Sequence, residues 1–124
     1  MQYSEFVQRV KDRIGITSTS EAEIAINATL TTLGERITGG EANDLAAQLP
    51  EELKDPLTSS SSSEAEDFGL AEFYRRVTER EGLSVKESTE HARAVMGALS
   101  EAASGGELRD VQSQLPKEFD PLFG

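Results

Sequence analysis

Apolar residues recur at helical spacing in two stretches of the chain that begin alike. The apolar positions are Tyr3, Phe6, Val7, Val10 and Ile14 in the first stretch, and Leu70, Phe73, Tyr74 and Val77 in the second. Positions three, four and seven apart lie on one face of a helix. A glycine follows each stretch, Gly15 or Gly82, where a helix commonly ends. The pattern predicts two amphipathic helices whose aromatic side chains form part of the hydrophobic core rather than a ligand-binding site.

A second helix is predicted after each of these glycines. Ser18 stands three residues before Glu21, and Ser84 three before Glu87, which is the spacing of a capping box. The apolar stripe that follows is narrow and rich in small residues, which permits close helix packing. Its members are Ala22, Ile26, Thr29, Leu30, Leu33 and Ile37 in one stretch, and Ala92, Val95, Met96, Leu99 and Ala103 in the other.

Two glycines end each second helix, and shorter helices are predicted beyond them. A threonine or serine precedes each Gly-Gly-Glu sequence and gives the spacing of a further capping box, so a third helix begins there. Pro50 and Pro116 suit the first position of a short fourth helix, which would end before Pro56 or Pro121. No stretch alternates with a period of two, so no sheet is expected.

The two stretches are copies of one another. The matches keep their order along the chain: Glu5-Phe6 with Glu72-Phe73, Gly15-Ile16 with Gly82-Leu83, Gly39-Gly40-Glu41 with Gly105-Gly106-Glu107, Gln48-Leu49-Pro50 with Gln114-Leu115-Pro116, and Asp55-Pro56-Leu57 with Asp120-Pro121-Leu122. Ordered self-similarity indicates an internal repeat of about four helices per copy. We therefore predict an all-α protein of two tandem duplicated helical units, residues 1–57 and 68–124, packed as a pseudo-two-fold helical bundle.

Residues 58–67 separate the copies and are predicted to be a linker. Thr58 is followed by five serines and then by Glu64, Ala65, Glu66 and Asp67. A serine run has no apolar face to bury, which is typical of a flexible connector.

The charge of the chain narrows the classes of partner. The formal net charge is -11, from 23 acidic and 12 basic residues. Nucleic acids need clustered cations, whereas the densest basic cluster, Arg75, Arg76 and Arg80, is interspersed with glutamates. We therefore expect no nucleic-acid partner and no anionic membrane surface. An acidic, lysine-poor composition indicates a halophilic protein from a salt-loaded cytoplasm, with an ordinary acidic cytosolic protein as the alternative.

The absence of certain residue types and segments excludes further kinds of site and further classes of protein. The chain has no cysteine, which rules out disulfides, thiolate nucleophiles and zinc–thiolate sites. No apolar run is long enough for a transmembrane helix, and the first residues lack the pattern of a secretory signal. A cytoplasmic location is expected.

The single histidine, His91, is the residue most suited to catalysis. Glu87 lies one helical turn before it, so a carboxylate–imidazole pair can form on one helix face. A catalytic histidine also needs an orienting acid and a nucleophile or substrate proton. His91 aligns with Ala25 of the first copy, so the shared architecture does not require a histidine there. We therefore favour a position at the surface or at the rim of a site.

Acidic pairs lie near both Gly-Gly sequences, Glu41 with Asp44 and Glu107 with Asp110. Acids at a helix N-terminus interact favourably with the helix dipole, which explains them without catalysis. Neither the acidic loop of a calcium site nor the Glu-x-x-His motif of a helical metal site occurs. The double glycines also lack the strand and the Gly-Lys-Ser/Thr of a phosphate loop. We expect neither a metal nor a cofactor.

One long pattern resembles a known family. It reads Tyr3-x-x-Phe6 … Ala22 … Leu33-x-x-Arg36-Ile37-x-Gly39-Gly40-Glu41-Ala42-x-Asp44-Leu45-x-x-Gln48-Leu49-Pro50. This is similar to the domain of unknown function 2267 (DUF2267), found in small bacterial and archaeal proteins. The second copy keeps both Gly-Gly-Glu and Gln-Leu-Pro but has Leu108 in place of the alanine. The resemblance implies a tandem helical fold and a cytoplasmic location, and it implies no activity and no catalytic residue.

These observations predict a non-catalytic protein-interaction or self-assembly module, and not an enzyme. A small core often leaves an apolar face for a second subunit, so a protein partner or self-association is expected. The candidate interaction surface comprises Gly39, Gly40, Glu41, Gly105, Gly106, Glu107 and His91. The alternative is a small-ligand-binding protein, or an enzyme that uses His91 with nearby carboxylates.

Overall fold

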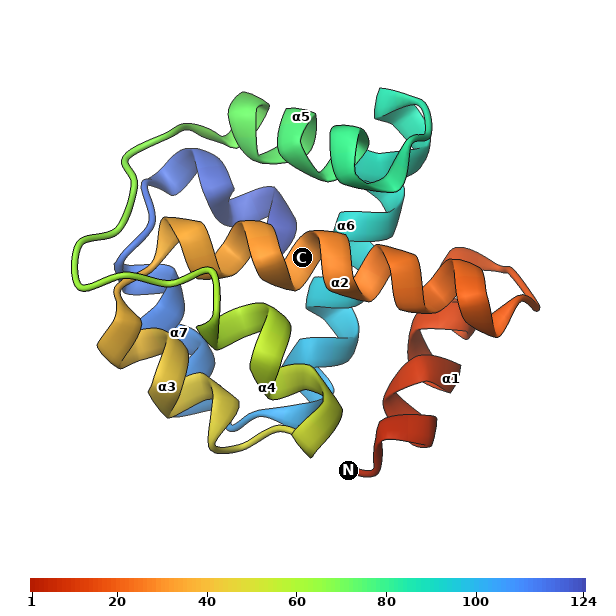
Figure 1. Cartoon of the computed structure of the whole chain (residues 1–124), viewed down its shortest axis with the longest axis horizontal. Coiled ribbons are helices and arrows are strands. Elements are labelled where there is room, and N and C mark those ends of the chain that lie inside the picture. Colours follow the sequence, from red (N-terminus) through yellow and green to blue (C-terminus); the bar gives the residue numbers. More distant parts are fainter.

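The computed structural model describes all 124 residues, and they form eight helices (Figure 1). The seven α-helices are α1 (Tyr3–Ile14), α2 (Thr19–Arg36), α3 (Gly39–Ala46), α4 (Glu51–Thr58), α5 (Leu70–Glu81), α6 (Val85–Ala102) and α7 (Gly105–Ser113). A 3-10 helix, η1 (Lys117–Leu122), ends the chain. The prediction of an all-α fold is confirmed. No helix combines the length and the apolar composition that crossing a membrane requires.

Two glycines end α1 and α5, as the sequence predicts. Gly15 and Gly82 have φ angles of 85° and 73°, the left-handed conformation that other residues adopt only with strain. Their N–H groups donate to the carbonyl oxygens of Lys11 and Thr78, each at 2.8 Å. The chain therefore turns sharply at both places and enters α2 and α6 directly.

The first helix of each half packs on the second helix of the other half. Besides the contacts within each half, α1 lies against α6, and α5 lies against α2, which crosses the middle of the molecule (Figure 1). α3 lies against α7, α4 packs on α2, and η1 packs on α6. The resulting core is one continuous cluster to which both halves contribute. Phe6 and Phe73 are completely buried in it, and Tyr3 and Tyr74 are partly buried against it, which confirms that the aromatic residues of α1 and α5 form core. Phe119 is completely buried there as well.

Arg36 ties the end of α2 to the second half of the chain. The residue is 5% exposed, and its Nε donates to the carbonyl oxygen of Phe68 at 2.7 Å. The guanidinium also lies over the ring of Phe119, 5.3 Å from the ring centre, so its charge faces the π electrons of a buried ring. This largely buried cation is thus paired with groups from the second half of the chain.

Proline does not end the fourth helix, contrary to the prediction. α4 continues through Pro56 to Thr58, and η1 includes Pro121. Pro50 and Pro116 precede these helices as their N-caps. In an eight-residue helix the missing N–H of Pro56 removes one intrahelical bond, whereas the next residue, Leu57, is completely buried. The burial of Leu57 holds this turn in helical form.

The serine-rich connector is hydrogen-bonded to the first half of the chain, whereas the sequence predicts a flexible linker. The N–H of Gly39 donates to the carbonyl oxygen of Ser62 at 2.8 Å, and the N–H of Glu66 donates to that of Glu35 at 3.0 Å. The hydroxyl of Ser60 donates to the carbonyl oxygen of Pro56 at 3.0 Å. The two backbone bonds fix the path toward α5, and the serine hydroxyl bonds back to the nearby backbone of α4.

Candidate functional site

Side chains that can bind protons or cations, carboxylates and the imidazole of His91, gather at two opposite ends of the molecule. One is the junction of α3 and α7, and the other lies between the α1–α2 turn and the α5–α6 turn (Figure 1). The residues predicted as one interaction surface are divided between them. Glu41 and Glu107 lie at the α3–α7 junction, and His91 lies at the other end.

The helices of the α3–α7 junction have mixed caps. The hydroxyl oxygens of Thr38 and Ser104 accept from the N–H groups of Glu41 and Glu107, at 3.3 and 3.1 Å, as a capping box requires. The glutamates, however, do not reach back to the cap residues. Glutamine side chains from the opposite half of the chain take that place.

The two glutamines act reciprocally. Oε1 of Gln114 accepts from the N–H of Thr38 at 3.0 Å, and Oε1 of Gln48 accepts from the N–H of Ser104 at 2.7 Å. Each Gln-Leu-Pro sequence therefore caps the third helix of the other half. Because a free N–H at a helix start needs an acceptor, this explains why glutamine stands in both copies. The sequence shows the repeated glutamine but not its distant partner.

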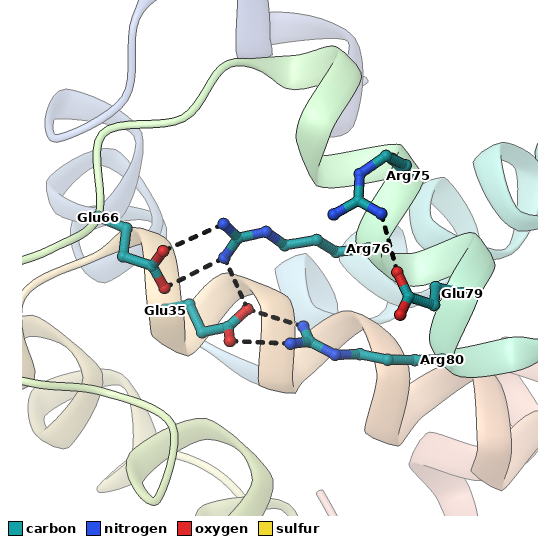
Figure 2. A pocket seen from close by; sticks show the side chains of 6 residues that line it. All are labelled: Glu35, Glu66, Arg75, Arg76, Glu79 and Arg80. Atoms are coloured by element: carbon teal, nitrogen blue, oxygen red, sulfur yellow. Dashed lines mark hydrogen bonds and ion pairs between the residues drawn. The ribbon is translucent and has the colours of Figure 1, made fainter.

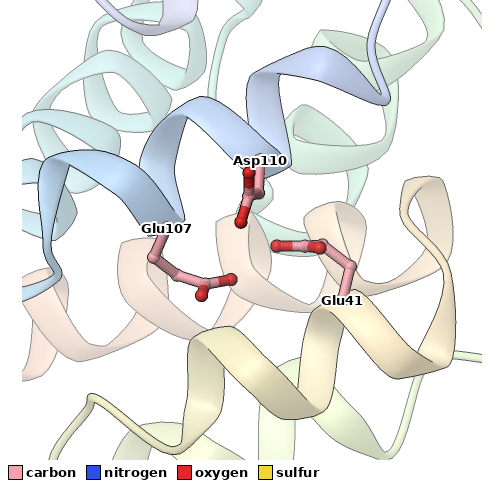
Figure 3. Close-up of side chains that lie close together, drawn as sticks. All are labelled: Glu41, Glu107 and Asp110. Atoms are coloured by element: carbon pink, nitrogen blue, oxygen red, sulfur yellow. The ribbon is translucent and has the colours of Figure 1, made fainter.

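Glu41 and Glu107, which do not cap the helix starts, form an acidic cluster with Asp110 (Figure 3). One carboxylate oxygen from each of Glu41, Glu107 and Asp110 lies within 4.8 Å of the others. Oε1 of Glu41 and Oε1 of Glu107 are buried and have no hydrogen-bond partner. Burial first, and then the neighbouring Glu107, Asp110 and Asp44, raise the pKa of Glu41 to about 7.

The cluster can share a proton between its carboxylates, or attract a hard cation. A proton on Glu41 would turn an unpaired acceptor into a donor toward Glu107. Carboxylate oxygens are also the ligands that Ca²⁺ and Mg²⁺ prefer. The sequence pairs Glu41 with Asp44 and Glu107 with Asp110 along single helices, and only the packing of α3 on α7 joins the two pairs. Of the nearby glycines, Gly39 packs against Ser62, whereas Gly40, Gly105 and Gly106 are exposed.

His91 lies at the other end of the molecule, where it lines a pocket. The residue is 7% exposed, so of the two predicted positions, the surface or the rim of a site, it does not take the surface, and its partner is Glu81 rather than the predicted Glu87. Nδ1 of His91 lies 2.6 Å from Oε2 of Glu81, the last residue of α5. The turn at Gly82 folds α5 back over the start of α6, which brings Glu81 to the imidazole. Glu87 accepts a hydrogen bond from the hydroxyl of Ser84 at 3.0 Å instead.

A pocket of about 160 Å³ lies beside this pair, between the two matching turns. Its lining residues are Ile16, Glu21, Ile24, Glu81, Leu83, Glu87 and His91. Ile24 is 49% exposed and Leu83 41%. The side chain of Glu81 is only 1% exposed, yet its Oε1 has no hydrogen-bond partner. The pocket therefore combines an apolar wall with an unpaired, buried carboxylate oxygen.

The basic cluster predicted on α5 is fully occupied by carboxylates (Figure 2). Arg75 bonds to Glu72 and Glu79, at 2.7 and 2.8 Å. Its hydrogen bond, and that of Arg76, lower the pKa of Glu72 to about 2. The arginine side chains of this cluster thus form ion pairs with carboxylates of the same chain.

The rest of this cluster joins α5 to α2. Arg76 bonds to Glu66 at 3.1 Å and to Glu35 at 3.2 Å, and Arg80 bonds to Glu35 at 2.7 Å (Figure 2). Burial acts to raise the pKa of Glu35, but the hydrogen bonds and charges of Arg80 and Arg76 outweigh it and lower that pKa. The arrangement is that of an ion-pair network between two helices.

Comparison with known proteins identifies a family without a named activity. The search of curated proteins finds no match. The family model described as "Uncharacterized conserved protein (DUF2267)" matches residues 3–122. Because this match spans nearly the whole chain, and agrees with the motifs around both Gly-Gly-Glu sequences, the chain belongs to the DUF2267 family.

Proposed function

We propose that this protein is a non-catalytic protein-interaction or self-assembly module. The supporting observation is the position of its exposed apolar side chains. Ile24, Leu83 and Val85 are 49%, 41% and 61% exposed, and Met1 is the only other large apolar side chain in this class. Ile24 and Leu83 line the same pocket, and Val85 follows Leu83 by two residues. Apolar groups gathered at one end of a soluble helical fold favour contact with another molecule.

The proposal includes the finer architecture predicted from the sequence, two duplicated units related by a pseudo-two-fold axis. Reciprocal contacts support it, since α1 lies on α6 as α5 lies on α2, and Gln48 and Gln114 cap each other's halves. A module of this form presents two matching turns side by side. The predicted cytoplasmic location also stays part of the proposal.

The lining of the His91 pocket favours binding over catalysis. None of its seven residues carries a hydroxyl or thiol nucleophile. Small-molecule sites commonly enclose roughly 300–1,000 Å³, which is larger than this pocket of about 160 Å³. The pair of Glu81 and His91 still favours one second candidate, a small-ligand-binding protein or enzyme that uses His91 with these carboxylates.

The interaction proposal is tested with full-length protein and a surface variant. Light scattering after size exclusion, at low and high salt, measures self-association, and affinity capture from the source organism measures partners. We expect the triple variant Ile24→Ser/Leu83→Ser/Val85→Ser to lose the assembly or the captured partner. Asn27→Ser, an exposed polar position on α2, is the control. A monomer at both salt concentrations, with identical capture by wild type and triple variant, would overturn the proposal.

If the protein is instead a small-ligand-binding protein or an enzyme that uses His91, a different experiment detects it. A small-molecule library, screened by ligand-observed NMR against wild type and His91→Gln, would show a ligand that binds only the wild type. Partner capture would then be the same in both proteins.

A further inference from the structure

We propose that the pocket between the α1–α2 and α5–α6 turns binds a peptide segment of a basic protein, with one apolar side chain next to a lysine or arginine. This rests on the proposed interaction function and names the chemistry of the partner. The segment's apolar side chain would enter the pocket against Ile16, Ile24 and Leu83. Its cation would lie against the carboxylates of the rim.

The dimensions of the pocket suit one side chain. At about 160 Å³ it is smaller than sites for small ligands but large enough to enclose part of an aliphatic residue. The exposed surface of Ile24, Leu83 and Val85 would be removed from water around it. A few residues that fill well-packed, desolvated pockets carry most of the binding energy of an interface, and arginine is among the residue types enriched there.

The charges of the pocket select a cation. Its three carboxylates belong to Glu21, Glu81 and Glu87, and none of them forms an ion pair with a lysine or arginine of this chain. The side chain of Glu81 is 1% exposed, and its Oε1 lacks a hydrogen-bond donor. A buried oxygen without a partner is costly, and a lysine or arginine from a ligand would supply the donor.

His91 fixes the orientation of that carboxylate. Its Nδ1 bonds to Oε2 of Glu81 at 2.6 Å, which leaves Oε1 as the free oxygen. His91 is therefore a positioning residue in this site.

A second copy of this chain is a poor occupant. A two-fold interface places the same patch on both subunits, so Glu21, Glu81 and Glu87 would face their own copies. Like charges across an interface are repulsive, and the whole chain carries a formal net charge of -11. A basic partner removes this repulsion, and it also gains from long-range attraction to the acidic protein.

The test uses the intact protein and a defined probe. The probe is the peptide acetyl-Gly-Ser-Leu-Lys-Ser-Gly-amide, titrated while the methyl signals of Ile16, Ile24 and Leu83 are followed by NMR. Matched peptides carry Leu-Glu or Ser-Lys in place of Leu-Lys. We expect saturable shifts confined to these methyl groups with the Leu-Lys probe, and weakening as salt screens the charges.

Three variants separate the apolar and the charged contributions. Leu83→Ser removes apolar wall, and the double variant Glu21→Gln/Glu87→Gln removes rim charge. Each is expected to weaken probe binding by about tenfold. Glu5→Gln, an exposed acid in the first turn of α1, should leave binding unchanged. All of these substitutions are at positions that are at least one-third exposed, so the variants should remain folded.

Equal shifts with the Leu-Glu or Ser-Lys peptide, or equal binding by all variants, would overturn the inference. If the wild type assembles or captures a partner through Ile24, Leu83 and Val85 but ignores the Leu-Lys probe, this inference fails and the interaction function stands. A protein that stays monomeric, captures nothing specific and ignores the probe contradicts both.

Discussion

Gly34 allows α2 and α4 to approach more closely than any other residue would. A Cβ at this position would overlap the carbonyl oxygen of Leu57 and the hydroxyl of Ser60. We expect Gly34→Ala to lower the free energy of unfolding by about 2 kcal/mol, because backbone of the core must move to admit the methyl group. Urea denaturation followed by circular dichroism measures the change.

Gly40→Ala is the matched control for this prediction. A Cβ at Gly40 meets no atom within 4 Å, and the residue lies in the first turn of α3. The free energy of unfolding of the Gly40→Ala variant should stay within about 0.5 kcal/mol of the wild-type value or rise, because alanine favours the helical conformation. Equal effects at the two glycines would show that close packing is not what Gly34 provides.

The acidic cluster makes stability fall as pH rises. The pKa of Glu41 is about 7 in the folded protein against 4.5 for a free side chain, so between these values the folded state holds more protons. The free energy of unfolding therefore decreases across this range. We expect Glu41→Gln to remove much of the slope and to stabilise the protein at pH 8 by about 1 to 2 kcal/mol, since remaining solvent contact reduces the full effect.

Denaturation curves from about pH 5 to 8 measure this slope. Glu5→Gln, an exposed acid in the first turn of α1, should keep the slope of the wild type. An unchanged slope in Glu41→Gln would exclude proton sharing at the α3–α7 junction.

Sequence predicts residues whose role is local and misses those whose role depends on packing. Ser18 and Gly15 act within one turn of the backbone, so spacing identified both. The partner of His91 is Glu81, ten positions away across a helical hairpin, and helix periodicity pointed instead to Glu87. The close approach at Gly34 likewise depends on where α4 lies.

At the scale of the helices, Glu35 joins α2 to α5. It accepts from Arg80 and Arg76, and all three side chains are less than one-third exposed. We expect Glu35→Gln to cost about 1 to 2 kcal/mol, because the paired arginines lose a charged acceptor. Since its folded pKa is lowered, this contribution is present above about pH 4.5 and disappears as pH falls through the folded value.

Glu79→Gln is the control on the same network. Glu79 pairs with Arg75 on the surface of α5 and is 72% exposed. Chemical denaturation should place this variant within about 0.5 kcal/mol of wild type. An effect as large as that of Glu35→Gln would mean that the α2–α5 link adds nothing specific.

The reciprocal glutamine caps are unequal. Gln114 bonds both to the N–H of Thr38 and to its hydroxyl, in a partly buried place, whereas Gln48 makes one bond to Ser104 in an exposed place. We expect Gln114→Ala to cost about 1 kcal/mol and Gln48→Ala less. Thermal unfolding measures both, with the exposed Gln8→Ala on α1 as control. A larger loss for Gln48→Ala would contradict the geometry.

The helices themselves could be predicted because their signals lie within a few residues. Caps, terminal glycines and apolar spacing place α1, α5 and the starts of α2 and α6, whereas α2 and α6 end at Arg36 and Ala102, before the double glycines, which begin α3 and α7. α4 was the exception, since burial of Leu57 outweighs the effect of Pro56 on the helix. Which helix packs on which is not a local property, so the crossing of α1 onto α6 became visible only in the structure.

For the whole molecule, excess negative charge makes salt stabilising. The formal net charge of -11 produces self-repulsion in the compact state, which salt screens. We expect the thermal midpoint to rise between about 0.1 and 1 M KCl, as the screening length falls from about 10 Å to 3 Å. Scanning calorimetry tests this, with a neutral osmolyte as control. A falling midpoint would show that ion pairs such as those of Arg76 outweigh the repulsion.

The packing of α1 on α6 has a consequence for how the chain reaches this fold. Arg9 and Arg13 of α1 both bond to Glu101, which is 92 and 88 residues away in sequence. Proteins dominated by such distant contacts fold more slowly than helical proteins built from neighbours. During synthesis α6 follows α1 only after α2, α3, α4 and α5 have been made. Until then the apolar face of α1, which carries Phe6, Val7 and Val10, can pack only on helices of its own half, so the core of the N-terminal half stays incomplete until α6 is made.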